Sequence, residues 1–238
     1  MIEFASHKSL PDGRRAAYIS SQYRIKKVNG KDFIRVRHTY GAATAPYEGP
    51  TEALTADNTV IRIHLNSVVS TPGMHYSTAD ITDYYLMTDK LDDPEYMWAQ
   101  LKNIPLATQE RFNLRALATK DGRVLVKILK GIYGLPQAGR LAQQKLKAHL
   151  AANGYHEARH TPCLFLHTTR DISFTLVVDD FGIAWSHQAD FDHLQDTLEK
   201  LYKLKVDHTG SKYLGLDILW NYTPGARKVQ LSMPRYIA

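Results

Sequence analysis

"FTLVVDDFGIAW", residues 174–185, places two adjacent carboxylates between two short apolar runs. Each run is rich in β-branched and aromatic residues, which is typical of a buried strand. A tight turn between strands usually contains Asn-Gly or Asp-Gly, whereas Asp179 and Asp180 stand here. Two carboxylates about 4 Å apart repel by roughly 4 kcal/mol at an effective dielectric constant of ~20, so they need either a cation or open water. The pair alone leaves a metal site and a solvated acidic turn both open.

A third carboxylate lies in "HYSTADITDYYLM", residues 75–87, which predicts a strand that runs into a turn or short helix. Asp80, near the end of that strand, would complete an oxygen cage for Mg²⁺, which prefers a few carboxylates together with waters and substrate phosphates. Two such ions a few Å apart activate a 3′-hydroxyl and stabilise the leaving pyrophosphate. Standing alone, Asp80 would favour a helix N-cap instead.

A glycine-rich loop, "KGIYGLPQAGR" at residues 130–140, precedes a predicted helix. Gly131, Gly134 and Gly139 let the backbone approach a flat ligand closely. Gln137 offers both a hydrogen-bond donor and an acceptor. Taken alone, this stretch predicts only a loop that leads into a helix.

The rest of the chain predicts a mixture of strands and helices. Residues 1–20 are polar and are expected to form a loose lead-in, and residues 88–122 are expected to be irregular. Asn29-Gly30 predicts a two-residue hairpin turn. The expected helices are about 55–71, 138–153 and 188–204, and the expected strands are 23–28, 31–40, 75–80, 123–129, 163–168, 173–178, 182–185, 211–220 and 228–233.

Composition limits the classes of protein that fit the chain. The 238 residues are 44% hydrophobic, which suffices for a core without disulfides. The single cysteine, Cys163, excludes a disulfide scaffold and a classical zinc finger. No apolar run approaches ~20 residues and no apolar leader is visible, so we expect an intracellular protein without a membrane partner, in a cytoplasmic particle or the nucleus. A net charge of +6 permits a polyanionic partner.

Four motifs follow one another in a fixed order: "DITDYYL" at 80–86, "KGIYGLPQAGRLA" at 130–142, "FTLVVDDFG" at 174–182 and "KYLGLDI" at 212–218. Together they resemble motifs A, B, C and E of the reverse transcriptase of Ty/copia-type long-terminal-repeat retrotransposons. The resemblance covers Tyr23 to Ile237. "YGLPQAG" with a following Asp pair is its specific part, since any one motif alone is weak.

The resemblance implies an α+β fold, a polymerase palm and fingers with a mostly antiparallel sheet, helices on its far face and a truncated thumb. The implied domains are a polar lead-in at 1–20 and a reverse transcriptase domain at 21–238. Within that domain, the fingers are expected at about 21–74 and 88–130, the palm at about 75–87 and 131–222, and the start of a thumb at 223–238.

The resemblance also assigns roles to individual residues. Asp80, Asp179 and Asp180 match the catalytic carboxylates that bind two Mg²⁺ ions, for which Mn²⁺ can substitute. Ile81 would add a backbone carbonyl to the metal. Tyr85 matches the aromatic residue that screens the sugar of the incoming nucleotide.

Three further residues are implied to bind the nucleotide. Gln137 matches a glutamine that lies along it. Arg35 or Arg37 is similar in placement to a fingers arginine that binds its phosphates, because guanidinium can bind phosphate with two hydrogen bonds. A solvated strand arginine explains either position as well, and the choice between the two stays open.

The expected contacts with the primer come from two places. Lys212, Tyr213 and Leu214 resemble the turn that supports the primer end. Val177 stands where family members have a tyrosine that touches the primer terminus.

The implied reaction is Mg²⁺-dependent nucleotidyl transfer that copies an RNA template, and DNA as well, from a primer with dNTPs. The chain would be part of a longer polyprotein with integrase and RNase H. Three alternatives stay open. The first is a catalytically degenerate retroelement fragment that retains at most nucleic-acid binding, which the complete set of aspartates opposes. The others are another palm-fold enzyme such as a nucleotide cyclase, and a plain nucleic-acid-binding module whose salt-sensitive binding ignores Mg²⁺.

Overall fold

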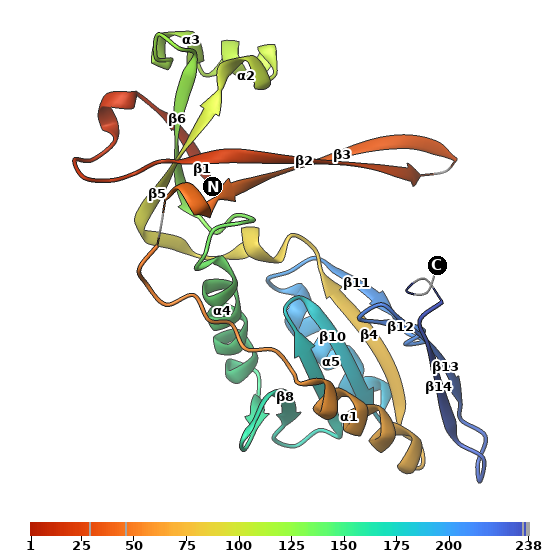
Figure 1. Ribbon diagram of the computed structural model, residues 1–238. Coiled ribbons are helices and arrows are strands. Elements are labelled where there is room, and N and C mark those ends of the chain that lie inside the picture. Colours follow the sequence, from red (N-terminus) through yellow and green to blue (C-terminus); the bar gives the residue numbers. More distant parts are fainter. Residues whose placement is uncertain (29, 46, 235, 237–238) are drawn as a thin grey trace. The chain divides into compact units, whose positions relative to one another are not determined.

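The chain folds into two compact units, each built around its own β-sheet (Figure 1). The first unit comprises residues 1–52 and 85–142, and the second comprises residues 53–84 and 143–238. This computed structural model describes residues 1–28, 30–45, 47–234 and 236.

The boundaries between the two units differ from the boundaries expected between fingers and palm. The segment 21–74, expected to belong to the fingers, is split, because residues 53–74 belong to the second unit. The expected start of a thumb at 223–238 includes Arg235, Ile237 and Ala238, which lie outside the described residues.

The first unit contains a five-stranded sheet in the order β1-β6-β5-β2-β3. Its neighbours are antiparallel except for β2 and β5, which pair in parallel. Its elements are β1 (Ile2–Ala5), η1 (His7–Ser9), β2 (Ala17–Val28), β3 (Lys31–Gly41), η2 (Ala42–Thr44), η3 (Tyr84–Met87, whose first residue belongs to the second unit), β5 (Lys90–Gln100), η4 (Leu101–Asn103), α2 (Leu106–Arg111), α3 (Leu114–Leu117) and β6 (Arg123–Lys130).

The predicted hairpin is confirmed. β2 and β3 pair without interruption from Tyr18 opposite Gly41 to Val28 opposite Lys31, and Figure 1 draws them as a long ribbon in red and orange. Asn29 of the predicted turn lies outside the described residues.

The expected loose lead-in at 1–20 is wrong. β1 pairs antiparallel with β6, with Ile2 opposite Ile128. The Arg14 guanidinium lies 2.9 Å from the Asp93 carboxylate. A four-residue strand carries too little periodicity to be recognised, and its partner β6 comes from the distant second half of the unit.

The expected irregular region 88–122 is also wrong, because residues 90–100 form β5. Pro94 argues against a strand in the sequence, since proline lacks the N–H that a sheet ladder uses. The structure accommodates it where the register of β5 with β6 shifts, between Lys90 and Glu95. A bulge is one of the few places in a sheet where proline fits.

The second unit contains a six-stranded sheet in the order β11-β4-β10-β9-β8-β7 and a three-stranded sheet in the order β12-β13-β14. Among the described residues, no helix has the length and apolar character needed to cross a bilayer. The elements are α1 (Asn58–Ser70), β4 (His75–Ile81), α4 (Ala138–Ala152, whose residues up to Ala142 belong to the first unit), β7 (Tyr155–Ala158), β8 (Thr161–His167), β9 (Ile172–Val177), β10 (Asp180–Trp185), α5 (Gln188–Glu199), β11 (Leu204–Asp207), β12 (Lys212–Tyr213), β13 (Leu216–Asn221) and β14 (Lys228–Ser232).

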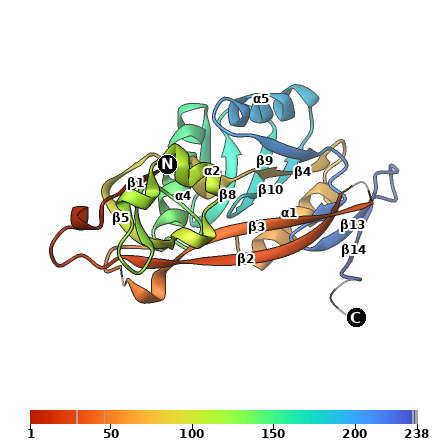
Figure 2. The ribbon, with the colours of Figure 1, turned by 90° about the horizontal axis from the view of Figure 1, so that it is seen from above.

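The six-stranded sheet is antiparallel, and β10 lies inside it between β4 and β9. Its buried residues pack against helices on both faces, with α5 on one side and α1 on the other (Figure 2). On the α5 side, Trp185 packs on Phe191 at 5.5 Å between ring centroids. On the α1 side, His64 Nε2 lies 3.0 Å from the Ser173 hydroxyl. Two covered faces explain why β9 and β10 are almost continuously apolar.

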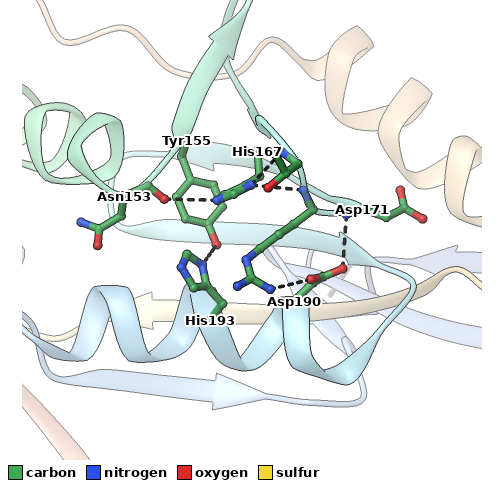
Figure 3. Close-up of polar contacts among 8 residues, drawn as sticks. Asn153, Tyr155, His167, Asp171, Asp190 and His193 are labelled. Carbon is green, nitrogen blue, oxygen red and sulfur yellow. Dashed lines mark hydrogen bonds and ion pairs between the residues drawn. The ribbon is translucent and has the colours of Figure 1, made fainter.

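Polar contacts also fix α5 to the strands β7 to β9 (Figure 3). The Tyr155 hydroxyl lies 2.9 Å from His193 Nδ1 on α5. Arg170 donates to one Asp190 oxygen at 2.9 Å, and the backbone amide of Asp171 donates to the other at 3.2 Å. The sheet that carries the aspartates is therefore held rigidly on its α5 side.

Candidate functional site

Two of the predicted carboxylates come from adjacent strands. Asp80 near the end of β4 stands directly opposite Asp180 at the start of β10. Directly opposed residues of an antiparallel pair project to the same face, with Cβ atoms about 4.5–5.5 Å apart. The structure therefore brings the carboxylates of motifs A and C to one place.

The third carboxylate sits in the turn beside them. Asp180 opposes Val177, which leaves Val178 and Asp179 as the turn residues between β9 and β10. The amide of Ile81 donates to the Asp179 carbonyl at 3.0 Å, so the turn is tied to the end of β4. Val178 has φ of 60°, a conformation that is costly for a β-branched residue. Strain of this kind is often found where a site must hold an unusual geometry.

The three carboxylates act on one another electrostatically. Partial burial raises the pKa of Asp180, and the charges of Asp179 and then Asp80 raise it further, to about 6. A carboxyl group with so high a pKa gains from a nearby cation, which would stabilise its ionised form.

One cation of the chain already lies beside this group. Lys205 of β11 stands opposite Asp80, and its Nζ is 3.1 Å from Asp80 Oδ2. Sequence reasoning missed it because the helix expected at 188–204 ends at Glu199, and β11 begins at Leu204. In the sequence alone, the basic run 200–205 is typical of the end of a helix.

A cavity of about 510 Å³ opens at the carboxylates. Asp80, Asp180 and Lys205 line it, together with Lys212 and Leu214 from the segment expected to support the primer. The structure thus brings motif E to the same cavity as motifs A and C.

Tyr213 anchors that segment. Its side chain is 3% exposed, and its hydroxyl lies 3.0 Å from the Thr175 hydroxyl. Gly182 makes this possible, because a Cβ there would overlap the Tyr76 hydroxyl and the Tyr213 ring. The glycine that follows the Asp pair therefore lets β12 pack onto the sheet, while Lys212 stays exposed.

The predicted nucleotide-binding residues Tyr85, Gln137, Arg35 and Arg37 belong to the first unit. The Arg37 guanidinium stacks 4.4 Å from the centroid of the Tyr133 ring, and the half-buried Tyr85 meets the same ring edge-on at 5.5 Å. Arg35 is exposed on the ribbon. The structure therefore distinguishes the two arginines without choosing between them as ligands.

Gln137 is 5% exposed, and its Nε2 donates to Glu95 Oε1 at 3.3 Å. Its Oε1 is buried and has no hydrogen-bond partner among the described residues. It lines a cavity of about 850 Å³ in the first unit, together with Arg14 and Arg140.

Within the described ranges, no three His, Cys, Asp or Glu side chains are placed as a group that would hold a metal ion. Mg²⁺ needs fewer protein ligands than three, because it keeps several waters and is usually held by one or two carboxylates plus substrate phosphates. The pair Asp80 and Asp180 meets that requirement, and a cation there would stabilise the Asp180 carboxylate, whose pKa is raised by burial and then by the charges of Asp179 and Asp80. The donor set therefore fits Mg²⁺.

No protein-family model matches the chain. A curated relative from Saccharomyces cerevisiae, the "Putative transposon Ty5-1 protein", is 32% identical over 112 residues. The chain is similar to a transposon protein. The match covers 45% of this chain and 35% of the yeast protein, so the chain spans about a third of that relative. This similarity supports a transposon-related origin.

Proposed function

We propose that the chain is the RNA-directed DNA polymerase domain of a copia-type retrotransposon. The observation that carries this proposal is the direct opposition of Asp80 and Asp180, with Asp179 in the adjoining turn. Similarity to a Ty5-1 protein supports the retroelement origin. The substrates would be dNTPs and a primed RNA or DNA template, and the chain would act as part of a longer polyprotein.

In this proposal the carboxylates of Asp80 and Asp180, with Asp179 beside them, hold two Mg²⁺ ions or Mn²⁺ in their place. When bound, the ions would lower the pKa of the 3′-hydroxyl and neutralise the phosphates. Lys205 and Lys212 line the cavity and supply further positive charge for the phosphates. The buried backbone of β4 and β10 keeps the carboxylates in place, which is the preorganisation that phosphoryl transfer requires.

The remaining roles are proposed from the motifs. Tyr85 and Gln137 would contact the sugar and the length of the incoming nucleotide, and Arg35 or Arg37 its phosphates. Ile81 would add its carbonyl to a metal. The roles of Tyr85, Gln137 and the arginines require their side chains to face the nucleotide. Substitution of each of these residues, followed by measurement of dNTP affinity, tests that requirement.

Primed poly-rA with an oligo-dT primer and Mg²⁺ or Mn²⁺ tests the proposal. We expect extension by the parent chain and at least a hundredfold loss in Asp179→Asn and Asp180→Asn. Asp196→Asn is the matched control, because Asp196 is an exposed aspartate on α5. Equal extension by all four proteins would show that these carboxylates are not catalytic.

A degenerate fragment that only binds nucleic acid is the second candidate. The observation that favours it is the Lys205–Asp80 ion pair, which occupies a carboxylate oxygen that a metal would need. A folded parent chain that binds the hybrid but extends no primer would support this candidate. Gain of extension in Lys205→Met would instead show that the ion pair suppresses an intact site.

A further inference from the structure

A second cavity lies at the opposite end of β4 in the second unit. It has a volume of about 460 Å³, and it shares no lining residue with the cavity at the aspartates. His75, at its wall, precedes Asp80 by five residues, which is about 17 Å along a strand that rises 3.3–3.4 Å per residue. The two cavities are therefore separate sites on one sheet.

Aromatic rings form the walls of this cavity. The His75 ring stacks on the Trp185 indole, with centroids 5.1 Å apart and planes 30° apart. Trp220 lies parallel to Tyr222, with centroids 5.6 Å apart and planes 5° apart. Both pairs line the cavity, the first from β4 and β10 and the second from β13 and the turn after it.

Hydrogen bonds hold both indoles in place. Trp185 Nε1 donates to the Ser77 hydroxyl at 2.9 Å, and Trp220 Nε1 donates to the Gly210 carbonyl at 3.1 Å. The polar atom of each ring is thus bound to the protein, and what the ring offers a ligand is its apolar surface. Rings fixed in advance lose little entropy when a ligand binds.

Tyr222 is held on two sides. Its hydroxyl accepts a hydrogen bond from the Tyr76 amide at 3.1 Å. The Arg227 guanidinium stacks 4.9 Å from its ring centroid and donates to the Val68 carbonyl at 2.7 Å. Arg227 does not line the cavity, so it supports the wall without placing a charge inside it.

The lining of this cavity contains no Lys, Arg, Asp or Glu among the described residues. The cavity at the aspartates, by contrast, is lined by both signs of charge. Polar groups of the residues at the aromatic cavity are the Gln188 amide, two imidazoles, two indole N–H groups, and the hydroxyls of two tyrosines, one serine and one threonine. Apolar rings with a few neutral hydrogen-bonding groups are the usual make-up of a site for a small planar ligand.

We propose that this aromatic cavity binds an unpaired nucleobase, either of a free nucleoside or of a single-stranded nucleic acid. The base would pack against the part-exposed rings of the wall, which already stack on one another in pairs. The Gln188 amide oxygen and the imidazole nitrogens would bond its edge, while Gln188 Nε2 donates to Asp192 Oδ1 at 2.8 Å. The uncharged lining excludes the phosphates, which stay outside. The site is independent of metal and of polymerase activity.

Adenosine, uridine and an eight-nucleotide single-stranded RNA test the proposal, each titrated in EDTA. The readouts are tryptophan fluorescence, which reports on the indoles of the wall, and saturation-transfer NMR of the base protons. We expect quenching by at least one of the three ligands, and a Kd raised at least fivefold in His75→Ala and in Gln188→Ala. Leu231→Ala is the matched control, because Leu231 is exposed on β14 and outside the cavity.

Binding of adenosine or uridine alone supports the site with a free nucleoside as its ligand. Binding of the RNA alone, if both variants abolish it, supports the site with an unpaired base of a nucleic-acid strand as its ligand. Absence of binding by all three ligands at millimolar concentration to the folded parent overturns the proposal, as does binding that both variants leave unchanged. Because no metal is present, failure of primer extension has no bearing on either result.

Discussion

Asp180 carries a stability cost that a cation would remove. Its pKa of about 6 lies above the usual value because burial and the charges of Asp179 and Asp80 disfavour the carboxylate. At pH 7.5 the group is ionised in both the folded and unfolded states, so the folded state bears that cost in full. The arrangement that we propose to hold Mg²⁺ therefore lowers the stability of the protein when no cation is bound.

Asp180→Asn should raise the free energy of unfolding by about 1–2 kcal/mol in EDTA at pH 7.5, a range reduced for solvent screening, because it removes a charge that burial and the neighbouring carboxylates disfavour. For a chain of this size that is roughly 2–4 °C in Tm per kcal/mol. Mg²⁺ should raise the Tm of the parent and leave that of the variant unchanged, since a ligand stabilises only the state that binds it. Asp196→Asn should behave as the parent does in both experiments. A parent whose Tm ignores Mg²⁺ would contradict the metal site.

His64 gives the fold a pH dependence of its own. Burial lowers its pKa to about 4, and a hydrogen bond involving Ser173 only partly opposes this. The unfolded state, with a pKa near 6.5, takes up a proton first as pH falls. The contribution of His64 to the free energy of unfolding is therefore present in full above about pH 6.5. It declines progressively down to about pH 4, by roughly 3 kcal/mol in total.

Urea unfolding between pH 7.5 and 4.5 measures this decline. The free energy of unfolding of His64→Gln should fall less over that pH range than that of the parent protein. The difference should equal the loss expected from His64, because glutamine takes up no proton when the variant unfolds. His38→Gln is the control, since His38 is exposed on β3. An unchanged slope in His64→Gln would place the acid-sensitive group elsewhere.

At the scale of elements, the sequence predicts those that carry their own periodicity. The helix after Asp57, the strand that contains Asp80 and the paired strands around Asp179 are all confirmed. β1 and β5 escape prediction, because one is too short to show a pattern and the other contains Pro94. Both depend on pairing with β6, which no local pattern reveals.

The candidate site likewise contains some residues that the sequence reveals and others that only the fold brings together. The aspartates stand out in the sequence because like charges between two buried strands conflict with ordinary turn chemistry, and the four ordered motifs assign them a role. Lys205 cannot, because it faces Asp80 only when α5 ends early and β11 pairs with β4. The aromatic cavity escapes prediction too, since Trp185 and Trp220 come together only when β13 packs beside β4.

Close packing at Gly182 links β10 to the β12–β13 hairpin. Gly182→Ala should lower the free energy of unfolding by about 1–3 kcal/mol, because the new methyl group overlaps the Tyr76 hydroxyl. Tyr76→Phe alone should cost little, since that buried hydroxyl has no partner among the described residues. The double variant should recover part of the stability, and a double-mutant cycle from urea unfolding measures the coupling. Strict additivity would show that the two groups do not meet.

The β2–β3 ribbon concentrates positive charge. Residues 17–41 contain six Lys or Arg and one Asp, and Arg24 stands directly opposite Arg35 on one face. Opposed like charges destabilise a strand pair, so an anion bound at this face would stabilise it.

Arg24→Gln with Lys26→Gln should weaken binding to an RNA–DNA hybrid. It should also reduce the slope of log K against log salt by about 1 for each phosphate that the ribbon no longer neutralises. Lys27→Gln is the matched control, because Lys27 stands opposite Asp32. Equal slopes would exclude the ribbon from binding.

At the scale of the whole molecule, each unit has a core of its own. The core of the first unit includes Val126 and Ile128 of β6, with Phe4 of β1 packed against it. The core of the second includes Phe174 and Phe181 beside the aspartates. The residues that would carry catalysis and those that hold the first unit together are thus different sets. A variant that destabilises one core can therefore be tested with the other core as its internal reference.

Deletion of residues 1–5 removes β1 from the edge of the first sheet. It exposes β6 and abolishes the burial of Phe4, so we expect the first unit to become less stable by about 2–3 kcal/mol. Hydrogen exchange measures this amide by amide, because local opening follows the stability of each cooperative unit. Amides of β5 and β6 should exchange on the order of a hundredfold faster, while those of β9 and β10 should keep their protection. Equal acceleration in β9 and β10 would show instead that one cooperative core, shared by both units, supports the ribbon and the aspartates alike.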